Sequence, residues 1–209
     1  MNYEVINYKD WNRSSQYLFF KEFEEPFTGV TCDVDVTKAY ENAKLAKFSF
    51  FQYYLHKSLL AANDLRPFRL RIVNDELRLY EKIHASATIS RADGTFGFSH
   101  IEFEKELTDF SREVVSEKER IAEDYNLFPP VHKENVIHFS AMPWLQFTSV
   151  SHARKYARPD SCPKISFGKV YKVGTVLKMP VSIHVHHGLM DGRDIGRYVD
   201  RFQTLLNEG

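Results

Sequence analysis

Length, composition and charge exclude several classes of protein. The chain has 209 residues, 28 basic residues balanced by 28 acidic ones, and 2 cysteines, Cys32 and Cys162, without CxxC spacing. Nothing therefore favours a nucleic-acid-binding surface, a disulfide framework or a zinc knuckle. No apolar stretch reaches the roughly 20 residues of a membrane-spanning helix, and the first residues lack the pattern of a secretion signal, so we expect a cytoplasmic protein with one domain over residues 1–209.

The N-terminal part of the sequence predicts strands and helices in alternation. In chain order we expect strands over residues 2–8 and 29–36 and helices over residues 11–21, 37–47 and 49–63. Asp10 and Thr37 precede or open helical patterns and are expected to cap them. Arg13 falls in a first helical turn, where the positive end of the helix dipole disfavours a cation, so we expect it to have a carboxylate partner elsewhere.

The rest of the chain mixes hairpins with separated helices. Asn74 and Asp75 tolerate tight turns and predict a hairpin. We expect strands over residues 67–73, 76–83, 86–90, 95–103, 136–142, 164–173 and 175–187, and helices over residues 105–125 and 191–208. This order predicts an α+β fold, a two-layer sandwich in which helices pack on a mostly antiparallel or mixed sheet.

A histidine-rich stretch, IHVHHGLMDGRD over residues 183–194, stands where a strand gives way to a helix. On a strand, His184 and His186 share one face and His187 points to the other, so adjacent histidines cannot chelate one ion. An HxH pair from His184 and His186 lacks a third ligand at a recognised spacing, and we expect no metal site. Ordinary hydrogen-bonded histidines are the structural alternative, whereas proton transfer is the functional one.

The full pattern HHGLMDG, residues 186–192, resembles the HHxxxDG motif of the chloramphenicol acetyltransferases and of the CoA-dependent acyltransferases that share their fold. SAMPWLQFTS (residues 140–149) resembles the SAxPWxxFxS block of that family, and DWNRSSQYLFF (residues 10–20) its N-terminal W-x-R segment. LFPPVHKEN and NDELRLYE resemble two further blocks. The resemblance extends over nearly the whole chain in a consistent order.

The resemblance implies a mechanism and assigns residues to it. His187 is expected to be the general base, and Ser140 the donor to the oxyanion of the tetrahedral intermediate. Ser166 stands where the family usually has a threonine that supports the intermediate through water, and it keeps the hydroxyl. Acetyl-CoA is the implied co-substrate, with no metal. Taken alone, Ser140 and Ser166 would read as ordinary strand hydroxyls.

Further residues are assigned by the same resemblance to supporting the site. Asp191 is expected to pair with Arg13 and to shape the loop that carries His187. Phe19, Phe20 and Phe96 are candidates for the aromatic wall of the acceptor pocket. The family is trimeric with each site at a subunit boundary, so we expect a homotrimer whose active sites lie between chains.

Two segments depart from the family pattern. Residues 150–164, VSHARKYARPDSCPK, are basic and poor in aromatic residues where the family is usually rich in phenylalanine, and Glu24 and Glu25 replace apolar wall residues. Such a pocket penalises an apolar antibiotic and favours a polar or charged acceptor. Chloramphenicol is nevertheless the leading acceptor by resemblance.

Two alternatives remain open from the sequence. The first is an acyltransferase for another alcohol, amine or thiol, related to the lipoamide acyltransferases, although the chain shows no lipoyl-like domain or flexible linker. The second is a non-catalytic trimeric binding protein on the same fold, because a fold can persist after its chemistry is lost.

Overall fold

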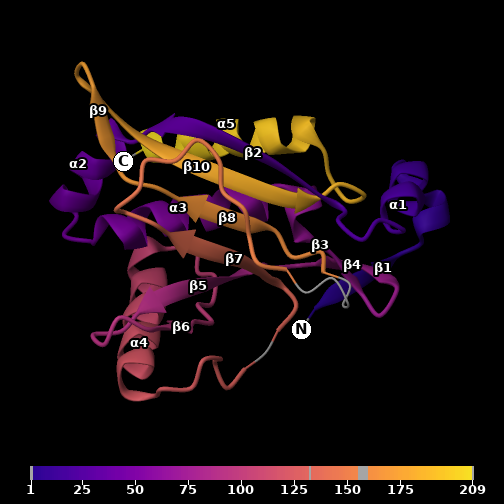
Figure 1. The fold of residues 1–209 in the computed structure, drawn as a ribbon, viewed down its shortest axis with the longest axis horizontal. Coiled ribbons are helices and arrows are strands. Elements are labelled where there is room, and N and C mark those ends of the chain that lie inside the picture. The colour runs from indigo at the N-terminus through magenta and orange to yellow at the C-terminus, as the bar shows by residue number, and fades with distance from the viewer. Residues whose placement is uncertain (1, 132, 155–159, 209) are drawn as a thin grey trace.

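A large mixed sheet, here called the central sheet, runs through the middle of the structure, and helices lie behind it in the view of Figure 1. This computed structural model describes residues 2–131, 133–154 and 160–208. The elements, in chain order, are β1 (Tyr3–Ile6), a 3₁₀ turn (Tyr8–Asp10), α1 (Ser14–Phe20), β2 (Phe27–Asp35), α2 (Thr37–Leu45), α3 (Phe50–Asp64), a second 3₁₀ turn (Arg66–Arg69), β3 (Leu70–Val73), β4 (Glu76–Tyr80), β5 (His84–Ser90), β6 (Phe96–Phe98), α4 (Leu107–Glu123), β7 (Val136–Ala141), β8 (Lys164–Phe167), β9 (Tyr171–Val173), β10 (Val176–His186) and α5 (Gly192–Asn207).

The central sheet follows the strand order β2, β10, β8, β7, β5, β6, with β9 paired to β10. Neighbouring strands are parallel from β5 through β7 to β8 and antiparallel elsewhere. A small antiparallel sheet, in the order β1, β4, β3, lies at one end of the molecule (Figure 1). The α+β fold with a mixed sheet is confirmed.

The two faces of the central sheet differ in chemistry. Phe139, Ile165 and Ile183 lie side by side in register, nearly or fully buried, and belong to the core formed with the helices. Burial of such a side chain contributes about 1.5–3 kcal/mol. Because side chains alternate along a strand, the neighbours Ser140 and Ser166 point to the opposite face. Residues 142–154, the described part of the chain that follows β7, cross that face (Figure 1).

The predicted hairpin at Asn74 and Asp75 is confirmed. Both residues have positive φ, 51° and 63°, as a two-residue type I′ turn between β3 and β4 requires. Short polar side chains tolerate this left-handed region better than most residues do, which is why the sequence alone locates the turn.

Two predicted helix caps are wrong. Asp10 lies in a 3₁₀ turn whose cap is Asn7, and α1 begins only at Ser14. Thr37 is already the first residue of α2, and its hydroxyl instead accepts a hydrogen bond from the Leu177 N–H at 2.9 Å. Asn7 thus provides the cap that we expected from Asp10, and the Thr37 hydroxyl bonds to a strand instead of capping α2.

The strand predicted over residues 164–173 is interrupted. It forms β8 and β9, and between them the Lys169 N–H donates to the Leu145 carbonyl at 2.8 Å rather than to a neighbouring strand. The crossing segment therefore ends β8 by taking its hydrogen bond. Among the described residues, no helix combines the length and the apolar character needed to cross a bilayer.

Candidate active site

His187 lies in the turn between the end of β10 and the start of α5. Its backbone N–H donates to the Pro26 carbonyl at 2.8 Å, and its ring Nδ1 lies 3.3 Å from the Met190 carbonyl oxygen. Because a carbonyl oxygen only accepts, Nδ1 carries the proton in this contact and Nε2 keeps its lone pair. The main chain therefore holds the ring in the tautomer that can accept a proton at Nε2.

One aromatic side chain of α1 packs directly on the His187 ring, and a second packs on the first. The Phe20 ring stacks on the His187 ring, with centroids 4.2 Å apart and planes inclined by 22°. Phe19 packs edge-on against Phe20 at 5.0 Å and is 61% exposed. The third predicted wall residue, Phe96, lies elsewhere, on β6 against Phe98 at 5.4 Å. The three wall candidates therefore form two groups within one chain.

Arg13 joins α1 to the loop that carries His187. Its Nη1 lies 2.7 Å from Asp191 Oδ2, and its Nη2 donates to the His187 carbonyl at 3.1 Å. Asp191 also caps α5 by accepting the Arg193 N–H at 2.9 Å. The Arg13 guanidinium holds the pKa of the Asp191 carboxyl below its ordinary value. Arg13 has the carboxylate partner that its place at a helix start led us to expect.

A row of hydroxyl groups, here called the hydroxyl row, crosses the polar face of the central sheet from strand to strand. Ser140, Ser166 and Ser182 lie in register on β7, β8 and β10, and the Thr31 hydroxyl of β2 donates to Ser182 Oγ at 3.0 Å. Ser166 is fully buried, and its Oγ has no hydrogen-bond partner among the residues that the structure describes. A buried hydroxyl without a partner is costly, so this one is suited to a ligand or a water molecule.

The hydroxyl row and His187 are far apart in one chain. His187 lies one residue past the end of β10 and five residues after Ser182, which corresponds to about 17 Å at the usual rise of an extended strand. Ser140 lies a further two strands away from β10. One chain therefore does not bring the His187 ring and the Ser140 hydroxyl to the same small molecule.

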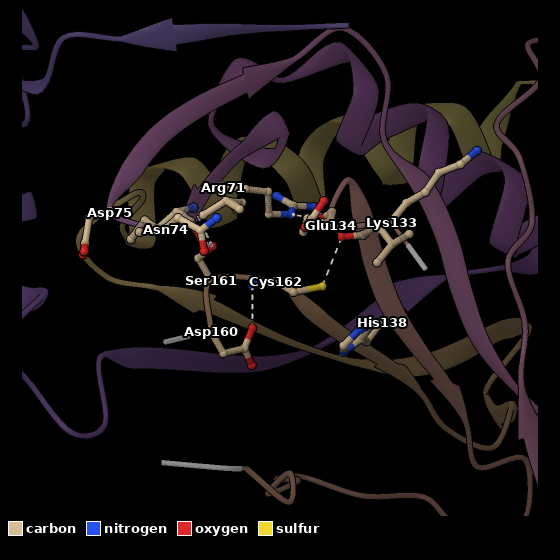
Figure 2. A pocket seen from close by; sticks show the side chains of 12 residues that line it. Arg71, Asn74, Asp75, Lys133, Glu134, His138, Asp160, Ser161 and Cys162 are labelled. Atoms are coloured by element: carbon tan, nitrogen blue, oxygen red, sulfur yellow. Dashed lines mark hydrogen bonds between the residues drawn. The ribbon is translucent and has the colours of Figure 1, made fainter. Parts of the chain in front are cut away.

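Charged side chains line a cavity beside the hydroxyl row. The cavity has a volume of about 440 Å³, and its lining includes His138, Arg154, Asp160 and Lys164. A second cavity of about 560 Å³ shares His138 and Asp160 with it. Figure 2 shows the second cavity, with the side chains of Asp160 and His138 on the opposite side from Arg71 in this view. The polar face of the central sheet is thus hollowed and charged next to Ser140 and Ser166.

The other two histidines of the histidine-rich stretch have protein partners. His186 is buried, its Nδ1 accepts the Gly188 N–H at 3.1 Å, and burial lowers its pKa to about 4. His184 Nε2 lies 3.2 Å from Ser182 Oγ, and its ring packs edge-on against His152 at 4.9 Å. Over the described residues, no group of three or more histidine, cysteine or acidic side chains is placed to hold a metal ion.

Several residues of the charged cavity were not singled out by the sequence. Arg154 Nη1 lies 2.9 Å from Glu25 Oε1, its guanidinium covers the Phe27 ring, and Lys164 Nζ lies 4.6 Å from the centre of the same ring. The sequence signalled this region only as a charged departure, at Glu24, Glu25 and residues 150–164. Of that segment, residues 155–159 lie outside the described residues. The contact between Arg154 and Glu25 depends on the tertiary fold, so no local sequence pattern predicts it.

Comparison with known proteins identifies the family. A family model described as chloramphenicol acetyltransferase matches residues 1–203. The chain belongs to the chloramphenicol acetyltransferase family. It is accordingly a CoA-dependent acetyltransferase, with acetyl-CoA as the co-substrate that this family uses.

Individual relatives agree with this assignment over almost the full chain. Chloramphenicol acetyltransferase 3 of Escherichia coli is 26% identical over 209 residues, which cover 99% of this chain and 98% of that protein. A chloramphenicol acetyltransferase of Bacillus pumilus is 29% identical over 198 residues, or 91% and 90% of the two chains. A solved chloramphenicol acetyltransferase structure superposes with a TM-score of 0.89 at 28% identity and covers 98% of this chain and all of its own, 100%.

A more distant structure shares the fold. The cubic core of the pyruvate dehydrogenase multienzyme complex superposes with a TM-score of 0.68 at 16% identity, covering 93% of this chain and 86% of that one.

Proposed function

We propose that this chain, as one acyltransferase domain over residues 1–209, transfers the acetyl group of acetyl-CoA to a hydroxyl group of a small-molecule acceptor. His187 Nε2 takes the proton of the acceptor hydroxyl as its oxygen attacks the thioester carbonyl carbon. Ser140 donates to the oxyanion of the tetrahedral intermediate. The carbon–sulfur bond then breaks, and the departing thiolate takes the proton back from the imidazolium.

The observation that carries the proposal is the state of the His187 ring. Its Nδ1 proton is committed to the Met190 carbonyl, and the stacked Phe20 ring shields one face of the imidazole. Nε2 is therefore the nitrogen left for the acceptor. A positioned base of this kind contributes about 100-fold to 10,000-fold in rate.

The hydroxyl row supplies the second half of the chemistry. Ser140 is half-buried on β7, and the buried Ser166 hydroxyl beside it lacks a partner among the described residues. Ser140 can donate directly to a developing oxyanion, and Ser166 can hold a water molecule that donates to it. Loss of one such donor elsewhere costs about 100-fold to 1,000-fold in kcat.

The separation within one chain sets the arrangement that we propose for the assembly. The His187 ring and the Ser140 hydroxyl are about 17 Å apart along the strand direction alone, so a site that uses both takes them from two chains. A closed homotrimer in which each boundary joins one His187 to a neighbour's hydroxyl row meets this requirement, because every boundary is then equivalent. Arg13 and Asp191 would hold the loop of His187 at that boundary.

A mixing experiment tests the base, the oxyanion donor and the shared site together. His187→Ala and Ser140→Ala chains are each expected to be nearly inactive in an assay of thiol release from acetyl-CoA with an acceptor present. Mixed assemblies, made by joint refolding or coexpression, are expected to regain about a quarter of the wild-type activity, since one boundary in four joins two intact halves.

The controls separate the alternatives. Light scattering after size-exclusion chromatography reads the oligomeric state, and a monomer that retains full activity contradicts a shared site. Mixed assemblies that stay inactive contradict it as well. Chloramphenicol is the first acceptor to test, because the relatives carry its name. Acetyl-CoA binding without transfer to any acceptor would instead favour the non-catalytic alternative.

A further inference from the structure

The cavity beside the hydroxyl row is placed to hold the acceptor. His138 and Lys164 line it, and they precede Ser140 and Ser166 by two residues on the same face of β7 and β8. Two residues along a strand correspond to about 7 Å. A molecule that fills the cavity can therefore present a hydroxyl group at the hydroxyl row.

One part of the cavity wall is flat and apolar. Phe98 and Phe128 line it with their rings stacked at 5.5 Å, and Phe96 packs against Phe98. This places the predicted wall residue Phe96 next to the cavity. Such rings stabilise an apolar ring of a ligand by stacking and by excluding water.

The other part of the wall is lined by three cations of the described chain. Lys164 is only 7% exposed, and its Nζ lies 2.5 Å from Asp160 Oδ2. Lys133 Nζ lies 2.6 Å from Glu102 Oε1, and Arg154 is paired to Glu25. Of the three carboxylates, Asp160 lines the cavity, whereas Glu102 and Glu25 approach their cations from outside its described lining. The ion pairs hold the three cations in place at the cavity wall.

These cations retain donors for a ligand. An ammonium has three N–H donors and a guanidinium has five. Among the described residues, Lys133 uses one donor on Glu102, and Lys164 uses two, on Asp160 and the Cys162 carbonyl. Arg154 contacts Glu25 through Nη1. A ligand carboxylate can accept from the remaining donors without breaking an ion pair, and such charge-assisted bonds are strong.

We infer that the acceptor is a hydroxy acid, a small molecule that carries its reacting hydroxyl group about 7 Å from a carboxylate, with a flat apolar body between them. The inference rests on the proposed function and names the substrate class of its site. A neutral apolar acceptor in the same place would cover the donors of Lys133, Arg154 and Lys164 without pairing them, which disfavours its binding.

A matched pair of acceptors tests this substrate class. The probes are 4-(hydroxymethyl)benzoate and its methyl ester, which share the alcohol and the ring and differ in charge, with chloramphenicol as a third acceptor. We expect kcat/KM for the acid to exceed that for the ester by about tenfold or more, as for one charge-assisted hydrogen bond. An ester or chloramphenicol that reacts as well as the acid, dependent on His187, overturns the substrate class and leaves the proposed function intact.

Variants of the cavity wall locate the preference. Lys133→Met, and Lys164→Met combined with Asp160→Asn so that no buried charge loses its partner, are each expected to reduce the acid-to-ester ratio about tenfold. Lys38→Met, an exposed lysine on α2, is the control and should leave the ratio unchanged. If the cavity variants keep the wild-type ratio of kcat/KM for the acid to kcat/KM for the ester, the inference is overturned. The same holds if a cavity variant changes the oligomeric state but leaves this ratio unchanged.

Calorimetric titration keeps the two proposals distinguishable. If no acceptor supports His187-dependent thiol release, the proposed function fails, and binding then decides the inference. Tighter binding of the acid than of the ester, reduced by the same wall variants, then supports a hydroxy acid as the ligand of the cavity, without the transfer step. Equal binding of the two probes overturns it.

Discussion

The two faces of the central sheet show how one set of strands serves two purposes. Ser166 and Phe167 are consecutive residues of β8, and both are buried. Phe167 packs against Tyr54 of α3 and Phe202 of α5 in the core. Ser166 points to the polar face, where its hydroxyl finds no partner among the described residues. The core face is satisfied within the chain, whereas the polar face is left with unused hydrogen-bonding capacity.

This difference indicates where stability and chemistry are separable. Substitutions on the core face should lower the free energy of unfolding and change the catalytic constants little. Substitutions on the polar face and at its end should change the catalytic constants more than the free energy of unfolding. The reason is that a buried polar group without a protein partner is characteristic of a group that binds a ligand. The predictions below test that separation, beginning with the largest effect.

His187→Ala removes the base at the end of the polar face. We expect kcat/KM to fall about 1,000-fold, because proton abstraction loses its positioned acceptor. The measurement is thiol release from acetyl-CoA over a range of acceptor concentrations, with the melting temperature as control. A large fall in the melting temperature would show that His187 is needed for folding, contrary to the separation of the two faces.

Phe167→Ala acts on the core face. Removing this fully buried ring should lower the free energy of unfolding by about 4 kcal/mol through lost burial and a residual cavity. Urea denaturation measures the loss. The catalytic constants of the fraction that remains folded should stay within a few-fold of wild type, and a large fall in kcat would mean that the core face also tunes the chemistry.

Acidification acts on His186, the last residue of β10. Burial lowers the pKa of His186 from 6.5 to about 4, so the unfolded chain binds the proton first as the pH falls. Stability from this group is complete above pH 6.5 and declines toward pH 4, by about 2 kcal/mol after allowance for its surroundings. His186→Asn keeps an acceptor for the Gly188 N–H but does not titrate. Unfolding of this variant should depend less on pH between those limits, and an unchanged profile would refute the assignment.

Ser166→Ala gives the smallest effect, with opposite signs for stability and rate. Removing an unpartnered buried hydroxyl should raise the free energy of unfolding by about 1 kcal/mol, while kcat falls about tenfold through loss of a supporting water. Chemical denaturation and steady-state kinetics read the two quantities on the same preparation. A loss of stability would mean that the hydroxyl is already satisfied in the folded protein.

The sequence predicts best what depends on local periodicity. The alternation over residues 29–36, the hairpin at Asn74 and Asp75 and the helices expected over residues 37–47, 49–63, 105–125 and 191–208 appear within two residues of their expected bounds. Each of them is specified by residues within a few positions of one another. The Thr37 cap and the continuity of residues 164–173 fail because distant backbone groups, Leu177 and Leu145, take hydrogen bonds there. The Asp10 cap fails for a local reason, because Asn7 caps a 3₁₀ turn that contains Asp10.

The candidate site divides in the same way. The motif around His187 and the need of Arg13 for a carboxylate are legible in the sequence, and the ion pair with Asp191 lies where the resemblance puts it. The residues of the charged cavity cannot be predicted from the sequence. Glu25 and Arg154 are distant in sequence, and the place of Lys164 two residues before Ser166 acquires meaning only once the neighbouring strands are in register.

Gly29 shows how the packing of the polar face constrains its future variation. A Cβ atom at this position would lie 2.5 Å from the His184 ring, which in turn contacts Ser182 and, through it, Thr31. Any side chain at position 29 should therefore force the His184 ring to move and break its contact with Ser182, so a saturation mutagenesis library should favour glycine here while His184 is kept. Larger residues at position 29 should be tolerated better in double mutants in which a smaller side chain replaces His184. Positions 29 and 184 should therefore change together among diverging homologues.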